Sequence, residues 1–116
     1  MFLGGNKVRY NQKEVNLHTH SRYSRHGEGE IIDYVKVAEE KGGLKVLGFS
    51  EHAPLPDRNL TYGRRMEYSS LPLYERDVRE AGKATSLKIL LGAECDWIKD
   101  EVSFYKEELL ERRGYS

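Results

Sequence analysis

Short apolar runs alternate with amphipathic stretches three times along this chain of 116 residues, and this rhythm limits the folds open to it. The three predicted strands are residues 14–18, 45–50 and 87–93. The three predicted helices are residues 30–41, about 70 to 84–86, and 101–113. A βαβαβα order of this kind favours a parallel sheet with helices on its faces, either open or curling into a barrel.

Two of the predicted helices carry boundary signals. Gly42 and Gly43 follow the first helix directly, and glycine commonly ends a helix because it adopts positive φ at no steric cost. The second helix is expected to begin after Ser69 or Ser70, either of which suits an N-cap, and its first turn tolerates Pro72.

The composition indicates one small domain spanning residues 1–116 and excludes several classes of function. Nineteen basic and 19 acidic residues give a formal net charge of zero, which argues against a general nucleic-acid-binding surface. The single Cys95 cannot form an intramolecular disulfide, and no apolar run approaches the roughly 20 residues that span a bilayer. We therefore expect a soluble, cytoplasmic protein with no membrane partner.

Metal-ligand residue types follow each of the three predicted strands. His18 and His20 lie two residues apart at the end of the first strand, so their side chains point to the same side. His26 follows in the same loop, His52 comes just after the second strand, and Glu94 just after the third. Ligands gather at the carboxyl-terminal edge of parallel sheets, so these side chains are predicted to converge on divalent cations. Each one alone is equally explained as an ordinary loop residue.

The segments that carry these residues resemble a known family. The run NLHTHSRYSRHGEGEIIDYVKVAEEKGGLKVLGFSEHAPLPD, followed by LLGAECDW, is similar to the polymerase-and-histidinol-phosphatase (PHP) metal-dependent phosphoesterases, and nearest to their histidinol-phosphatase branch. The resemblance extends from Val15 to about Lys99. It implies an α/β fold, a distorted (β/α)7 barrel, of which this chain would be the amino-terminal part.

The resemblance also implies a ligand set. His18 and His20 would bind one ion, His26 and His52 another, and Glu94 would bridge the ions. The family holds two or three Zn, Mn or Fe ions, and this chain is expected to hold fewer. His18, His20 and Glu94 would form the catalytic centre.

The implied reaction is hydrolysis of L-histidinol phosphate to L-histidinol and phosphate, a step of histidine biosynthesis. Divalent ions suit this chemistry because they activate water and neutralise phosphoryl oxygens, so no nucleophilic side chain is required. Arg64 and Arg65 are candidate substrate-binding residues, since a guanidinium matches the geometry of phosphate. Exposed loop arginines are also common without any ligand.

Other residues near the motifs carry weaker signals. Ser50 and Glu51 beside His52 invite a role in substrate contact. Cys95 is expected to be a buried thiol that points away from Glu94, and Trp97 is expected to pack against the protein.

The sequence departs from the family pattern in three respects. Asn16 stands where the family usually has Asp, Gly42 and Gly43 include one additional glycine, and no histidine follows Glu94 to supply the later ligands. Three interpretations stay open: the amino-terminal part of a histidinol phosphatase, a metal-binding or interaction module without turnover, and a different PHP phosphoesterase such as a nuclease-like enzyme. A partial barrel would also leave a strand edge open to self-association.

Overall fold

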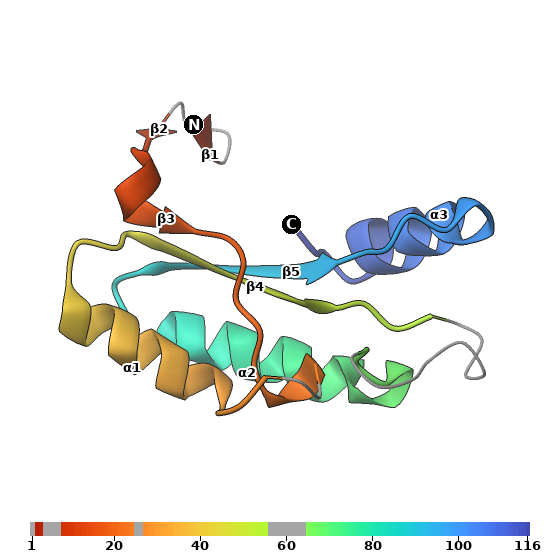
Figure 1. Cartoon of the computed structure of the whole chain (residues 1–116), viewed down its shortest axis with the longest axis horizontal. Coiled ribbons are helices and arrows are strands. Elements are labelled where there is room, and N and C mark those ends of the chain that lie inside the picture. Colours follow the sequence, from red (N-terminus) through yellow and green to blue (C-terminus); the bar gives the residue numbers. More distant parts are fainter. Residues whose placement is uncertain (1, 4–7, 25–26, 56–64) are drawn as a thin grey trace.

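The computed structural model describes residues 2–3, 8–24, 27–55 and 65–116. Its centre is a parallel sheet with strand order β3-β4-β5. The strands are β3 (Val15–Asn16), β4 (Val46–His52) and β5 (Lys88–Glu94). Helices α1 (Ile31–Lys41) and α2 (Leu71–Lys83) connect them and lie on the same face of the sheet (Figure 1). This arrangement confirms the predicted α/β class with a parallel sheet.

Helix α1 begins and ends where the sequence signals predict. At its start, the Asp33 carboxylate accepts a hydrogen bond from the Glu30 backbone N–H at 2.9 Å, which satisfies a donor that the helix cannot. At its end, Gly42 adopts φ 70° and its N–H donates to the Ala38 carbonyl at 3.2 Å. The additional Gly43 also has positive φ, at 81°, and a side chain there would meet no atom within 4 Å.

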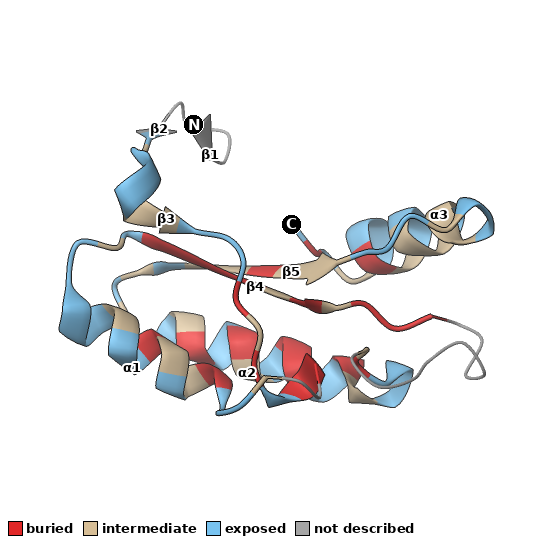
Figure 2. Ribbon diagram, viewed as in Figure 1, coloured by how far each residue is buried: buried red, intermediate tan, exposed pale blue. Residues whose placement is uncertain are grey.

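The core lies between the sheet and the two helices (Figure 2). Leu47 and Phe49 of β4 pack there with Val35 of α1 and Val78 of α2, and all four are buried. Tyr74 of α2 is also fully buried, and its hydroxyl donates to the Gly92 carbonyl of β5 at 2.8 Å. The hydrogen bond ties the helix to the sheet while removing the cost of burying the hydroxyl.

The first and last residues of all three strands differ from those predicted. Residues 12–14 form a 3-10 turn, η1 (Gln12–Glu14), so β3 is shorter than the predicted 14–18. The Ser50 N–H nevertheless donates to the Thr19 carbonyl at 2.9 Å, so the chain stays beside β4 past the assigned strand. Strands β4 and β5 run further than their apolar residues, through His52 and Glu94, because parallel pairing depends on backbone groups and not on side-chain polarity.

The last helix is not the regular amphipathic α-helix predicted over 101–113. It begins as the 3-10 turn η5 (Lys99–Glu101), continues as α3 (Val102–Phe104) and becomes a π-helix, η6 (Tyr105–Arg112). The predicted apolar side included both Leu109 and Leu110, but Leu109 is buried and Leu110 is exposed. Leu109 packs in the core cluster with Tyr115, whereas Leu110, the next residue, is 51% exposed.

Two peripheral features complete the described structure. Strands β1 (Phe2–Leu3) and β2 (Val8–Arg9) form a small antiparallel pair apart from the main sheet. At the other end, the Ser116 N–H donates to the Leu91 carbonyl at 2.7 Å, so the C-terminal residue lies against the outer edge of β5. Among the described helices, none has the length and apolar character needed to cross a membrane.

Candidate metal centre

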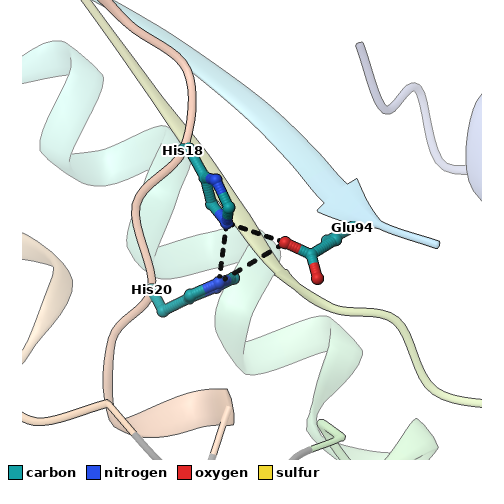
Figure 3. Close-up of side chains that lie close together, drawn as sticks. All are labelled: His18, His20 and Glu94. Carbon is teal, nitrogen blue, oxygen red and sulfur yellow. Dashed lines mark hydrogen bonds and ion pairs between the residues drawn. The ribbon is translucent and has the colours of Figure 1, made fainter. Parts of the chain in front are cut away.

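Three neighbouring strands bring the candidate ligands to one edge of the sheet. His52 and Glu94 are the last residues of β4 and β5 and lie opposite each other in the parallel register. His18 and His20 follow β3, and their side chains point toward Glu94 (Figure 3). The predicted convergence of His18, His20, His52 and Glu94 is therefore present in the fold.

The imidazoles of His18 and His20 share one carboxylate oxygen. Oε1 of Glu94 lies 2.7 Å from Nε2 of His18 and 3.6 Å from Nε2 of His20. The two Nε2 atoms are 3.1 Å apart. The His18 side chain is 70% exposed and that of His20 is 16% exposed, so the cluster opens to solvent on one side.

His52 contacts the other oxygen of the same carboxylate. Its Nδ1 lies 3.0 Å from Oε2 of Glu94, and its ring stacks on that of His20 with centroids 4.6 Å apart. The two oxygens of Glu94 thus face different imidazoles. A carboxylate placed in this way has the geometry of a bridging group between two adjacent positions.

The donor set suits a transition-metal ion. Imidazole nitrogen and carboxylate oxygen are the ligands that Zn, Mn and Fe accept. One ligand atom each from His18, His20 and Glu94 lies within 4.8 Å of the others. Two ligands at about 2.0–2.1 Å from a tetrahedral ion stand about 3.3 Å apart, and the observed separations lie on either side of that value. The residues therefore fit a metal ion with small movements.

The side chain of Asn16 forms a hydrogen bond with the backbone of His18. Its side-chain Oδ1 accepts a hydrogen bond from the His18 backbone N–H at 3.0 Å. A hydrogen bond of this kind, from a side-chain oxygen to the backbone N–H two residues later, forms an Asx turn. An amide oxygen accepts it as well as a carboxylate does. The replacement of Asp by Asn at this position is thus compatible with the local geometry.

Glu51 does not have the substrate-contact role that its place beside His52 suggested. The residue is 0% exposed, and its carboxylate accepts hydrogen bonds from the Ser21 backbone N–H and the Ser24 hydroxyl. Burial raises the pKa of this carboxyl, and the hydrogen bonds from both serines oppose that rise. The sequence contained no signal that Ser24 would contact Glu51, because the two residues meet only in the tertiary fold.

Of the remaining predicted site residues, the structure describes only Arg65. His26 and Arg64 lie outside the described residues. Arg65 forms an ion pair with Asp96, and its other terminal nitrogen lies 3.4 Å from the Ala53 carbonyl. The guanidinium therefore links the segments that follow β4 and β5, close to the cluster.

Two expectations about the residues after β5 are wrong. Cys95 is exposed, although burial of its sulfur is sufficient to raise the pKa of the thiol. Trp97 is 83% exposed and does not pack into the described core. Both residues follow the end of β5, so the strand alternation used to predict the orientation of Cys95 no longer applies there.

Comparison with known proteins gives a family match and a structural match. The model of the PHP domain family matches residues 16–116. The crystal structure of the "putative histidinol phosphatase hisK" from Listeria monocytogenes superposes with a TM-score of 0.68 at 27% sequence identity. The alignment covers 84% of this chain and 40% of the Listeria chain, so this chain spans less than half the length of that protein. No curated protein matches the chain.

Proposed function

Because this chain belongs to the PHP domain family, we propose that it is the metal-binding, amino-terminal part of a phosphoesterase of the histidinol-phosphatase branch. The observation that carries the proposal is the cluster of His18, His20 and Glu94 at the carboxyl-terminal edge of the parallel sheet. The fold shared with the Listeria protein supports the assignment to this branch. The described strands and helices then make up the first part of a PHP barrel.

In this proposal the chain's own residues hold and orient the ion. His18 and His20 would each supply one nitrogen, Glu94 would supply an oxygen to each of two adjacent positions, and His52 and His26 would serve the second position. When bound, divalent ions activate water and neutralise the phosphoryl oxygens of a phosphate monoester. The ring of His52 stacks on that of His20, so the two positions would be adjacent.

We propose L-histidinol phosphate as the substrate, with L-histidinol and phosphate as products. The name of the Listeria protein and the loop arginines favour this substrate over that of a nuclease-like relative. Arg65 would bind the phosphate while Asp96 orients its guanidinium, and Arg64 would act from the same loop.

The second candidate function is metal binding without turnover. The chain spans 40% of the Listeria protein, and its four histidines all precede residue 53. A centre for two or three ions would then lack ligands that another polypeptide or a longer chain must supply. Copies of this chain could associate through the sheet edge, but they carry only the same residues.

The decisive experiment measures phosphate release from L-histidinol phosphate by the purified chain, with Mn²⁺ or Zn²⁺ added and metal content determined on the same sample. Metal-dependent turnover that is lost in Glu94→Ala supports the phosphatase. Metal binding without turnover supports the second candidate. A rate of phosphate release in Glu94→Ala equal to that of wild type contradicts the assigned site.

Association is tested separately by sedimentation velocity at several concentrations. A dimer fraction that grows with concentration supports pairing through the open sheet edge. A single monomeric species up to high concentration contradicts it.

A further inference from the structure

We propose that Glu51 is a positioning residue for the metal centre, an inference that rests on the proposed function at His18, His20 and Glu94. Its carboxylate holds the segment that carries the first two histidines against β4. It does not touch the candidate metal ligands through its carboxylate in any described contact, and it acts through the backbone of that segment.

Glu51 forms hydrogen bonds with residues 21 and 24, which belong to one short turn of the chain. One carboxylate oxygen accepts from the Ser21 backbone N–H, which directly follows His20. The other accepts from the hydroxyl of Ser24, which lies in the 3-10 turn η2 (Arg22–Ser24). One buried group thus fixes the chain at both ends of residues 21–24.

Two further hydrogen bonds connect the same turn to the end of β4. The Ser24 hydroxyl oxygen accepts from the His52 backbone N–H at 3.1 Å, and the Thr19 carbonyl accepts from the Ser50 N–H at 2.9 Å. Together with the contacts of Glu51, they hold the backbone on either side of His20 beside the strand that ends in His52. These contacts lie within the chain itself, so they hold the backbone that carries the two imidazoles without an ion.

The position of Glu51 in the strand makes a purely structural explanation weak. Residues alternate across β4, so Glu51 faces the layer of α1 and α2 while His52 faces the metal centre. Its neighbours in that layer, Phe49 and Leu47, are apolar and buried. An apolar side chain would stabilise such a position more than a carboxylate, whose burial costs free energy unless it is fully hydrogen-bonded. The carboxylate is explained by the two donors that it satisfies, the Ser21 backbone N–H and the Ser24 hydroxyl.

The test measures the affinity of the full chain for Zn²⁺ by competition with a chromophoric chelator, together with the midpoint of thermal unfolding of the metal-free protein. Glu51→Gln preserves the volume, but the amide nitrogen cannot accept the hydrogen bond from the Ser24 hydroxyl. We expect Zn²⁺ to bind about tenfold more weakly, the lower end of the range seen when a group hydrogen-bonded to a ligand is lost, because Glu51 acts through the backbone.

The matched control is Glu75→Gln, which alters the other buried glutamate of the described core. Glu75 lies on α2 and contacts Arg113 and Tyr115, away from the metal centre. We expect this variant to unfold at a lower temperature and to bind Zn²⁺ within about twofold of wild type, because it touches no part of the residue 18–24 segment. The contrast separates positioning from general loss of stability.

Ser24→Ala gives a second test if Glu51→Gln does not fold. It removes only the hydroxyl and should weaken Zn²⁺ binding less than Glu51→Gln does, while Ser24→Thr, which retains the hydroxyl, should restore the affinity in part. Zn²⁺ affinity within twofold of wild type in Glu51→Gln, or in Ser24→Ala where the first variant is unfolded, overturns the positioning role. Failure of the wild-type chain to bind Zn²⁺ overturns the proposed metal site itself.

Discussion

Two clusters of polar side chains in this protein both contain glutamate, but one pairs it with histidines and the other with arginines. The metal centre joins the imidazoles of His18, His20 and His52 to Glu94. The second, which we call the arginine cluster, joins two glutamates of the helices to basic and phenolic groups at the C-terminus. Its members are Glu75, Glu108, Arg112, Arg113 and Tyr115.

The two clusters differ in whether their charges are already balanced by neighbouring side chains. Arg113 is permanently charged and donates to Glu108 at 2.8 Å and to Glu75 at 3.0 Å, so the arginine cluster balances its own charge. The metal centre instead joins imidazole nitrogens to one carboxylate, and both are donor groups that suit a divalent cation. One carboxylate set is thus paired with arginines, and the other lies among side chains that could hold a metal ion.

The largest expected effect breaks the metal centre alone. Glu94→Gln removes the only carboxylate that contacts these three imidazoles among the described residues, and we expect no Zn²⁺ binding measurable by chelator competition. Glu108→Gln in the arginine cluster is the control and should bind Zn²⁺ as wild type does. Retained affinity in Glu94→Gln would show that the ion, if bound, lies elsewhere.

The next effect breaks the arginine cluster alone. Glu75→Gln weakens the contacts with Arg113 and with the buried Tyr115 hydroxyl, and we expect a loss of about 1–3 kcal/mol in the free energy of unfolding. Urea denaturation at pH 7 measures it. An unchanged midpoint would mean that these hydrogen bonds contribute nothing net to stability.

A smaller effect is expected when only the contact with one oxygen of Glu94 is removed. His52→Ala removes the contact with Oε2 and leaves His18 and His20 on Oε1. We expect fewer ions bound per chain at saturation, while the tightest ion is held about as well as in wild type. Metal analysis after gel filtration checks the stoichiometry, and loss of all binding would contradict two separable positions.

The smallest effect concerns acid stability. Hydrogen bonds from Arg113, Tyr68 and Arg112 lower the pKa of Glu108 from its ordinary 4.5 to about 2. A lowered folded-state pKa contributes stability that is present above about 4.5 and lost as the pH falls toward 2. Glu108→Gln should therefore flatten the dependence of stability on pH in this window. Urea midpoints at pH 5, 4 and 3 measure it, and equal slopes for both proteins would contradict the shift.

Much of the fold was predictable because its signals are local. The pair Gly42-Gly43 marks the end of α1, and the predicted start of α2 after Ser69 or Ser70 agrees with its observed start at Leu71. Ser70 does precede α2, although its side chain makes no capping hydrogen bond. Helix periodicity and helix-breaking residues depend on neighbours in sequence, so they can be recognised without the tertiary fold.

The errors concentrate where the outcome depends on distant contacts. Cys95 and Trp97 are exposed after the end of β5, and of the two neighbouring leucines in η6 only Leu109 reaches the core. Contacts with the sheet and with the chain end decide which side of the last helix is buried, and these contacts join residues far apart in sequence.

The sequence by itself determined which residues lie at the strand ends, because period-two and helical spacing follow from backbone geometry and place His18, His20, His52 and Glu94 after apolar runs. Only the tertiary structure decided which of them meet. Strand order places β4 between β3 and β5, and the parallel register sets His52 opposite Glu94. The burial of Glu51 against Ser21 and Ser24 was also decided there, because hydrogen bonds between residues far apart in sequence exist only once the sheet and its loops have packed.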